Sequence, residues 1–407
     1  MNKKKIINDP LYGFITIRSE LIFDIITHSW FQRLRHIRQL GLTEFVYPGA
    51  LHTRFQHALG AMHLMGRALD TLRNRGVEIS DQEYEAAQLA ILLHDMGHGP
   101  FSHSLEETLL DGVHHESISY RFMLELNKRF NGALDLTLEI FRNSYSRKFF
   151  HALVSSQLDM DRLDYLNRDS FFTGVQEGRI GVDRIIAMLN VHDDELVVDE
   201  KGIYSIENFL SARRLMYWQV YLHKTTVSVE RMLINLVRRA RDLVASGHNL
   251  PSSDALAYFL KAPVGLEAFR DARTLEAFGA LDDHDVWGAL KMWQTHSDRI
   301  LSELCRMIIQ RKIFRIVLSN EPVSKTQVEQ VRRMVTRHYK ILRSESVYLF
   351  SLGTVTNEAY TEGQKIHILT REGKRIDVAQ ASDLPNIKAL SKIVKKNYLC
   401  WPKHLSL

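Results

Sequence analysis

Residues 92–103 read Leu92-Leu93-His94-Asp95-Met96-Gly97-His98-Gly99-Pro100-Phe101-Ser102-His103. An apolar helical run that begins at Ala86 ends here at a His-Asp doublet, and two glycines and a proline then break the helix. Neutral imidazole and carboxylate side by side suit iron, manganese, zinc or a mixed pair of metals. The stretch therefore predicts a metal-binding corner, and the alternative is a buried His-Asp hydrogen bond beside a glycine-rich turn.

Capping boxes predict where the neighbouring helices begin. Thr53 and Gln56 have the spacing of an N-cap and its N3 partner, and apolar residues then recur at helical spacing, which predicts a helix over 53–75. The run Ser80-Asp81-Gln82-Glu83 opens a second helix, which ends at the His-Asp doublet.

The rest of the chain is typical of a mainly α protein. We expect helices over 116–130 and 146–157, a β-hairpin over 195–206, a long uninterrupted helix over 206–246 and further helices to about 342. Strands are expected over 348–352, 365–369 and 375–379, and a final helix over 387–396. The sequence thus predicts a helical domain over 1–345 and a small α+β region over 346–407.

Composition places the chain among ordinary globular proteins. It has 407 residues, 45% of them hydrophobic and 25% charged, and a net charge of +5 that suits an anionic substrate or nucleic acid. Its two cysteines, Cys305 and Cys400, lie far apart and fit a reducing compartment. We find no signal-peptide pattern and no apolar run of membrane-spanning length, so a cytoplasmic enzyme that does not enter a membrane is expected.

A second polar cluster lies in residues 159–169. On a helix, Asp161, Tyr165 and Asp169 fall at i, i+4 and i+8 and share one face. That face supplies two carboxylates and a phenol and is a candidate ligand source. The alternative is a solvated charged face, on which Arg162 and Arg168 form surface pairs.

The order His57, His94-Asp95, Asp161 resembles the H…HD…D signature of the HD-domain phosphohydrolase superfamily. Flanking motifs narrow the resemblance, and they are Lys5 to Pro10, Phe31 to Gly41, Tyr47 to Ala50, Arg54 to His57, His94 to His103 and Asp161 to Asp169. Together they are similar to the deoxynucleoside triphosphate (dNTP) triphosphohydrolases, which include dGTPase-like enzymes and the SAM- and HD-domain-containing dNTPase. No SAM domain is expected in this chain.

The resemblance implies an HD-domain helical bundle with a metal-dependent active site. His57, His94, Asp95 and Asp161 would bind a divalent ion such as Fe, Mn, Mg, Zn or Ni. Water would attack the α-phosphorus of a dNTP and release deoxynucleoside and inorganic triphosphate, a step in dNTP catabolism. His98 would contact the α-phosphate, His115 would act as general acid, and Glu106 would orient His115.

The same resemblance implies nucleotide contacts. Arg54, Arg213 and Lys224 would hold the phosphates, Tyr165 and Tyr221 would lie near the γ-phosphate or sugar, and Gln39 and Leu40 beside the base and sugar. Residues 213, 217, 221 and 224 are spaced so that one face of the long helix would present them together.

An effector site and an oligomer are also implied. Lys5, Gln32 and Arg35 match effector-phosphate positions, whereas Thr27 stands where guanine-activated relatives have Asp, so a different nucleotide effector is open. A homo-oligomer, with a tetramer favoured, is expected. Two alternatives to the dNTPase remain, which are a phosphohydrolase or phosphodiesterase acting on another nucleotide, and a nucleotide-sensing or nucleic-acid-binding protein.

Overall fold

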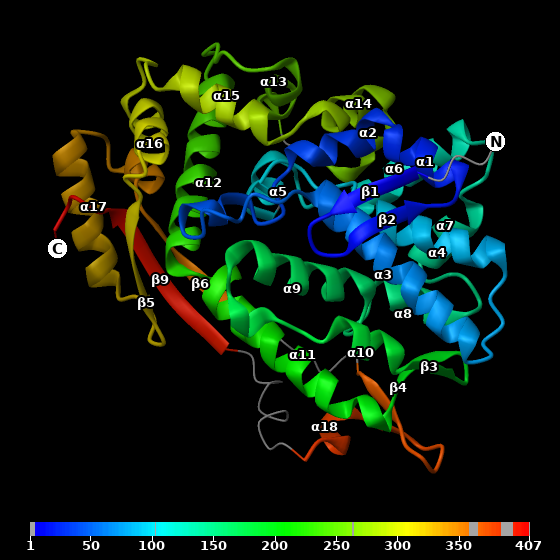
Figure 1. The fold of residues 1–407 in the computed structure, drawn as a ribbon. Coiled ribbons are helices and arrows are strands. Elements are labelled where there is room, and N and C mark those ends of the chain that lie inside the picture. The colour runs from blue at the N-terminus through cyan, green and yellow to red at the C-terminus, as the bar shows by residue number, and fades with distance from the viewer. Residues whose placement is uncertain (1–4, 102, 263, 358–364, 384–393, 407) are drawn as a thin grey trace.

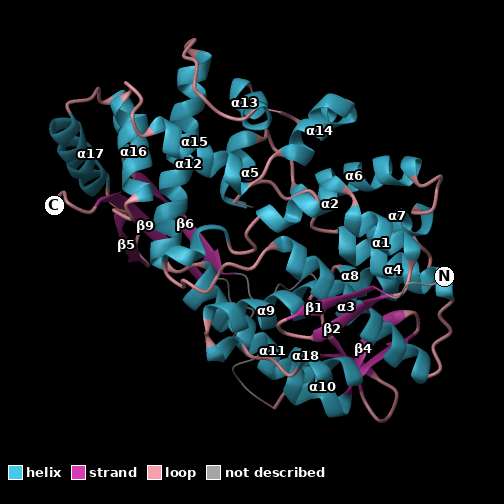
Figure 2. Ribbon diagram, turned by 45° about the horizontal axis from the view of Figure 1, so that its top comes forward, coloured by secondary structure: helices cyan, strands magenta, loops and turns pink. Residues whose placement is uncertain are grey.

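The computed structural model describes residues 5–101, 103–262, 264–357, 365–383 and 394–406. Helices dominate and the described strands form three small sheets, which confirms the predicted mainly α class (Figures 1 and 2). The two ends of the chain lie at opposite sides of the molecule (Figure 1). Within the described ranges, no helix combines the length and apolar content needed to cross a membrane.

Three helices that pack together carry the predicted metal ligands. Helix α3 (Arg54–Asn74) contacts both α4 (Asp81–Leu93) and α9 (Met160–Thr173). Both predicted capping boxes form, because Gln56 accepts from the Thr53 amide at 2.9 Å and Glu83 from the Ser80 amide at 2.8 Å. Gly60 permits the close approach of α9, since a Cβ atom there would collide with Asp164 and Arg168.

The N-terminal residues form a hairpin that was not predicted. Strands β1 (Lys5–Asp9) and β2 (Gly13–Ile17) pair antiparallel. Helices α1 (Glu20–Thr27) and α2 (Ser29–Gln32) and two 3₁₀ turns, Arg33–His36 and Gly41–Phe45, then lead to α3.

The remaining helices surround this centre and share one continuous apolar core. The predicted helices over 116–130 and 146–157 are present as α6 and α8, the second shorter than expected. The set is α5 (His103–Leu109), α6 (His115–Arg129), α7 (Asp135–Phe141), α8 (Lys148–Val154), α10 (Val182–Ala187), α13 (Asp254–Lys261), α14 (Ala272–Ala280), α15 (Asp283–Trp293), α16 (Arg299–Ile309) and α17 (Lys325–Tyr339).

The hairpin expected over 195–206 lies earlier in the chain. Its strands are β3 (Leu189–His192) and β4 (Glu195–Asp199), and the turn is made by Asp193 and Asp194, both at positive φ. Two-residue turns with positive φ match the twist of paired strands, which explains why the reversal occurs there. Residues 200–202 form a 3₁₀ turn that enters a helix.

The long helix expected over 206–246 is interrupted, so that prediction was wrong. Helix α11 (Ile203–Met216) continues into a π-helical turn at Tyr217–Tyr221, and α12 (Lys224–Ala245) starts afresh. The His223 side chain caps α12 by accepting from the Thr225 amide at 3.2 Å. Neither proline nor glycine marks the break, so no local signal in the sequence predicts it.

The C-terminal strands join two different sheets. Strand β9 (Val394–Pro402) lies between β5 (Phe314–Ser319) and β6 (Ser351–Asn357), while β7 (His367–Leu369) and β8 (Arg375–Asp377) extend the β3–β4 hairpin and precede α18 (Val378–Ala381). The strand expected over 348–352 begins only at Ser351. Of the helix expected over 387–396, residues 387–393 lie outside the described residues, and 394–396 belong to β9. The division near residue 346 stays a prediction.

Candidate metal centre and adjoining cavity

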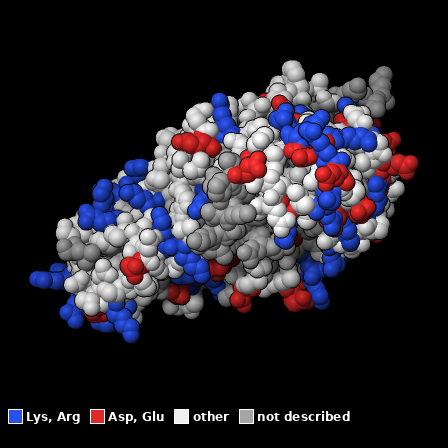
Figure 3. Space-filling model, turned by 90° about the horizontal axis from the view of Figure 1, so that it is seen from below, with Lys and Arg blue, Asp and Glu red and all other residues white. Residues whose placement is uncertain are grey.

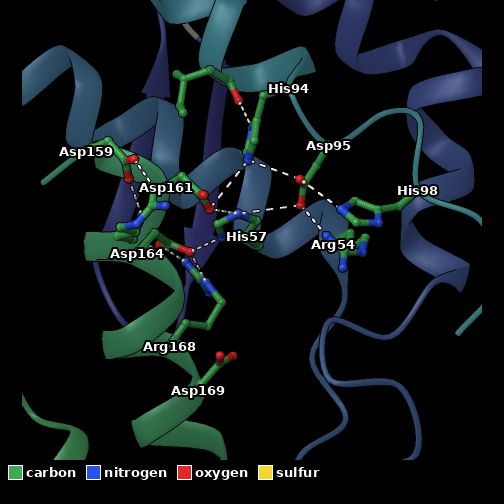
Figure 4. Close-up of polar contacts among 12 residues, drawn as sticks. Arg54, His57, His94, Asp95, His98, Asp159, Asp161, Asp164, Arg168 and Asp169 are labelled. Atoms are coloured by element: carbon green, nitrogen blue, oxygen red, sulfur yellow. Dashed lines mark hydrogen bonds and ion pairs between the residues drawn. The ribbon is translucent and has the colours of Figure 1, made fainter. Parts of the chain in front are cut away.

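Four side chains from three helices converge at one point (Figure 4). His57 lies in the first turn of α3, His94 and Asp95 follow the end of α4, and Asp161 lies in the first turn of α9. Asp161 Oδ1 is 3.1 Å from His57 Nε2 and 3.5 Å from His94 Nε2. Asp95 Oδ1 is 3.1 Å from His94 Nε2, and its Oδ2 is 3.7 Å from His57 Nε2.

The ring nitrogens of His57 and His94 that face this point lack a hydrogen-bond partner among the described residues. The Nε2 atoms of His57 and His94 are buried and make no well-aligned hydrogen bond with the described residues, although carboxylate oxygens lie close by. Buried polar atoms that lack a hydrogen-bond partner in a native structure often mark the position of a bound ion or water. Imidazole nitrogens and carboxylate oxygens together are typical ligands of transition metals. The residues present therefore fit a divalent cation held by His57, His94, Asp95 and Asp161.

Both histidines are oriented through their other ring nitrogen. His57 Nδ1 lies 2.8 Å from Asp164 Oδ2, and His94 Nδ1 contacts the Ile91 carbonyl. Such partners fix the tautomer and aim the second nitrogen at the metal position. Arg168 in turn holds Asp164 and reaches Asp9 at 2.8 Å. Arg168 is fully buried, so the alternative of a solvated charged face was wrong.

Electrostatics also favour a cation here. Burial alone would lower the pKa of His57, but the close carboxylates of Asp161 and Asp164 outweigh it and raise the pKa to about 10. Burial opposes ionisation of Asp161 too, and its two histidine neighbours nevertheless hold the pKa of this carboxyl well below its usual range. The centre thus stabilises positive charge among ionised carboxylates, which is the condition under which a divalent ion binds.

His98, His115 and Glu106 lie beside the centre as a connected group. His98 Nε2 is 3.3 Å from Asp95 Oδ1, and the His98 ring stacks on His115 with centroids 3.8 Å apart. Glu106 Oε1 accepts from the His115 amide at 2.7 Å and lies 3.5 Å from its Nδ1. Burial, followed by the charges of Arg54 and His115, lowers the pKa of His98 well below its usual value, so this imidazole is neutral.

Gly97 makes that arrangement possible. A Cβ atom at Gly97 would collide with the backbone of His115 and Ser119, so only glycine lets the start of α6 approach the His-Asp turn. The Ser119 hydroxyl accepts from the Gly97 amide at 2.8 Å and donates to the His94 carbonyl at 2.6 Å. The glycine after the doublet therefore positions His115 against His98.

A cavity of about 510 Å³ lies beside the centre, and Arg54 connects the two. Arg54 contacts Asp95, which belongs to the centre, and also lines the cavity. Gln39, Leu40, Tyr165 and Tyr221 line it as the resemblance implies. The other principal lining residues are Tyr217, Asp169, Glu107, Glu230, Arg231 and Arg238. Asp169 accepts from Tyr221 at 2.8 Å and lies 2.7 Å from His52 Nε2.

Two expected phosphate contacts are absent from the described cavity lining. Arg213 is buried and donates to Gln157 at 2.8 Å, whereas Lys224 is the exposed first residue of α12. The four residues 213, 217, 221 and 224 do not lie on one uninterrupted helix, as was expected, because a π-helical turn and a helix break at His223 separate α11 from α12. Tyr217 and Tyr221 line the cavity, and Arg213 and Lys224 do not.

The expected effector residues have partners of their own. The Lys5 ammonium lies 4.8 Å from the Phe23 ring centroid, and the Arg35 guanidinium 3.6 Å from that of Phe55. Gln32 donates to the Ile26 carbonyl at 2.6 Å and accepts from Arg35 Nε at 2.8 Å. Thr27 donates to the Asp24 carbonyl at 2.9 Å. An effector role for these residues stays a prediction.

Three supporting residues escaped sequence reasoning, namely Asp9, Asp164 and Arg168. The signal for two of them was present, because Asp164 follows Asp161 by three residues and Arg168 follows Asp164 by four, the spacings of neighbours on a helix. Asp9 had no such signal, since it reaches Arg168 from the end of β1.

Comparison with known families places the converging residues within recognised regions. Residues 54–169 match the model of the HD domain, and residues 180–253 match the model described as the HD associated region. The four centre residues lie inside the first match, and the π-helical turn lies inside the second.

Two similar proteins match nearly the whole chain, and one of them is described as a phosphohydrolase. The uncharacterized protein YwfO of Bacillus subtilis is 32% identical over 100% of this chain and 94% of its own length. A crystal structure of a phosphohydrolase from Bacteroides thetaiotaomicron is 51% identical, covers 98% of this chain and 100% of that one, and superposes with a TM-score of 0.95.

More distant similarity extends to named triphosphohydrolases. The deoxynucleoside triphosphate triphosphohydrolase SAMHD1 homolog of Dictyostelium discoideum is 31% identical over 58% of this chain and 49% of its own length. Human deoxynucleoside triphosphate triphosphohydrolase SAMHD1 is 28% identical over 59% and 45%. The matched region thus spans about half the length of these two relatives.

Proposed function

Because the chain belongs to the HD-domain phosphohydrolase family, we propose that it hydrolyses dNTPs to deoxynucleoside and inorganic triphosphate. The observation that carries the proposal is the cavity of about 510 Å³ that shares Arg54 with the candidate metal centre. Its volume is that of a pocket for a small molecule of nucleotide size. A phosphate bound near Arg54 would lie next to the centre, with the remainder of the nucleotide in the cavity.

The lining of the cavity matches the parts of a nucleotide. Arg54, Arg231 and Arg238 supply guanidinium groups, which pair with phosphate oxygens in a bidentate manner. Tyr165, Tyr217 and Tyr221 supply aromatic surface for a sugar or base. Gln39, Leu40 and Gly41 line the same cavity. Similarity to the SAMHD1 triphosphohydrolases supports a dNTP as this nucleotide.

The proposed reaction uses the chain's own acids and hydrogen-bond donors. Water attacks the α-phosphorus, the bond from that phosphorus to the 5′-oxygen breaks, and His115 gives its proton to the leaving oxygen while protons of the water pass to solvent. Neutral His98 donates a hydrogen bond to the α-phosphate, and Glu106 holds His115 in position. A divalent ion held at the centre would neutralise phosphate charge and activate water. Arg213 and Lys224 are proposed to contact the outer phosphates.

The test is product analysis with purified protein. Each dNTP alone, and then the mixture of all of them, is incubated with Mn²⁺ or Mg²⁺ in ¹⁸O-labelled water, and the products are separated by ion exchange. We expect deoxynucleoside and inorganic triphosphate, with the label in the triphosphate. Turnover only in the mixture would indicate a nucleotide effector. Orthophosphate, or a nucleoside monophosphate with pyrophosphate, would replace the proposal by a different phosphohydrolase reaction.

One surface feature favours nucleic-acid binding as a second candidate function. Figure 3 shows Lys and Arg gathered at the end of the molecule formed by β5, β9 and α17. Those elements carry one acidic residue, Glu329, against Arg315, Lys325, Arg332, Arg333, Arg337, Lys395 and Lys396. A salt-sensitive complex with single-stranded DNA that is lost in an Arg333→Ala, Arg337→Ala variant would support this candidate.

A further inference from the structure

A second cluster of metal-ligating side chains lies outside the HD centre. His36, Asp282 and His284 each present one ligand atom, and these atoms all lie within 4.8 Å of one another. His36 ends the 3₁₀ turn Arg33–His36, whereas Asp282 is the N-cap of α15 and His284 lies in its first turn. The cluster therefore joins two segments that are far apart in the sequence.

The two imidazoles of this cluster are available for a ligand. Their ring centroids are 5.0 Å apart and both residues are exposed. Neither ring forms a hydrogen bond with the described residues, and the contact of His284 Nδ1 with Asp282 Oδ1, at 3.8 Å, lies within the cluster itself. Asp282 is fixed between them, because its carboxylate accepts from the His284 amide at 2.7 Å and its own amide donates to Asp285 at 2.8 Å. A rigid carboxylate beside two unbonded imidazoles is already arranged for a cation.

We propose that His36, Asp282 and His284 form a second divalent-cation site, which takes an ion of the zinc class. Two imidazole nitrogens and one carboxylate oxygen suit Zn²⁺, Ni²⁺ or Cu²⁺, and water completes the coordination on the exposed side. Mg²⁺ and Ca²⁺ prefer oxygen ligands only and are disfavoured here. The proposal does not depend on the reaction at the HD centre.

An ion at this site would brace one wall of the cavity. Arg33, in the same turn as His36, donates to the Leu281 carbonyl at 2.8 Å and to the Met96 carbonyl at 2.7 Å. Asp283 accepts from the amides of Arg38 at 2.9 Å and Phe101 at 2.7 Å. Gln39 and Leu40, the two residues that follow Arg38, line the cavity. The cation thus clamps the start of α15 to the segment that leads into that wall.

Metal analysis tests the site itself. The full chain is equilibrated with Zn²⁺, freed of excess by gel filtration, and analysed for bound metal. We expect His36→Ala and His284→Ala to bind one ion per chain fewer than the wild type, and Asp282→Asn, which keeps an N-cap acceptor, to bind this ion at least about tenfold more weakly. Asp161→Ala should lose a different ion, so the double variant His36→Ala, Asp161→Ala should lose both.

The matched control is His248→Ala. His248 is also exposed and also lies beside a second histidine, His296, at 6.2 Å between ring centroids, but the nearby Asp298 is held by Arg239. This variant should bind as much zinc as the wild type. Equal zinc content in wild type, His36→Ala and His284→Ala would overturn the proposal.

Hydrogen exchange tests the clamp. In the wild type, Zn²⁺ should slow amide exchange in residues 33–40 and 96–101, and His36→Ala should lose this zinc-dependent protection while its exchange without zinc is unchanged, because the His36 side chain is exposed. The same zinc-dependent protection in wild type and His36→Ala would overturn the clamp.

Discussion

Arg168 holds Asp164 through two of its nitrogens, with Nε 2.9 Å from Oδ2 and Nη2 3.0 Å from Oδ1. Both side chains are completely buried, and the same Oδ2 lies 2.8 Å from His57 Nδ1. A buried ion pair therefore orients a histidine of the candidate metal centre. The stability of the fold and the affinity of the centre for metal are linked through this contact.

Asp164→Asn should weaken metal binding without removing a ligand. The Asn oxygen can still accept from His57 Nδ1, but the loss of the negative charge makes the ring a poorer ligand, and we expect about 10–100-fold lower affinity. Competition with a chelator measures this change. Asp183→Asn is the control, because Asp183 is exposed and pairs with Arg67 at the surface. Unchanged affinity in Asp164→Asn would contradict a role for this residue in orienting His57.

Arg168→Met should destabilise the fold by about 3–5 kcal/mol, the cost of leaving buried charges unpaired. Asp164 and Asp9 would both lose their cationic partner. Urea denaturation of the metal-free protein measures the free energy of unfolding. Arg67→Met, which breaks the exposed pair with Asp183, should change it by less than about 1 kcal/mol. Similar losses of unfolding free energy in Arg168→Met and Arg67→Met would show that the buried ion pair stabilises the fold no more than the exposed one.

His94→Ala and Asp161→Ala should each abolish turnover and the binding of the ion at the candidate metal centre. Each change removes one of the converging ligand atoms and leaves the others unable to hold the ion. Metal content of the purified variants, measured beside their hydrolytic activity, checks the expectation. Full activity in either variant would remove the metal assignment.

His115→Ala should slow turnover by about 10²–10⁴-fold while the metal stays bound, as expected for loss of a general acid. His115 stacks on His98 and contacts Glu106, and it is not one of the four converging side chains. The neighbouring His114 is the control, since its side chain is 87% exposed and His114→Ala should turn over normally. Metal loss in His115→Ala would show that its role is different.

Glu230→Gln should make the stability of the fold less sensitive to pH between about 4.5 and 7. Burial in the cavity wall raises the pKa of Glu230 from 4.5 to about 7, so between these values the folded chain holds a proton that the unfolded chain has lost. Wild-type stability from this group therefore falls as pH rises from about 4.5 to 7 and stays reduced above it. The unfolding free energy of Glu230→Gln relative to wild type should rise across that window, by on the order of 1–3 kcal/mol.

The comparison requires denaturation at several pH values from 5 to 8. Glu276→Gln, on the exposed side of α14, controls for the loss of one surface carboxylate. A constant difference between Glu230→Gln and wild type at every pH would contradict the role of burial at Glu230.

Local patterns predicted the helices that carry the centre. The capping boxes at Thr53 and Ser80 are signals within four residues, and both form as predicted. The elements that were missed depend on distant partners. Strand β9, part of which was expected to be helical, is held between β5 and β6, and strand formation depends on such neighbours more than on the segment's own composition.

The sequence alone predicted the metal ligands His57, His94, Asp95 and Asp161, because histidine and aspartate side chains bind metals whatever the fold around them. Packing alone brought Asp9 to Arg168, Arg231 and Arg238 to the cavity, and His36 to His284. The reason is physical. A helix cap is stabilised by hydrogen bonds between residues that are neighbours in the sequence. A contact between residues hundreds of positions apart forms only after the helices between them have packed their apolar faces together.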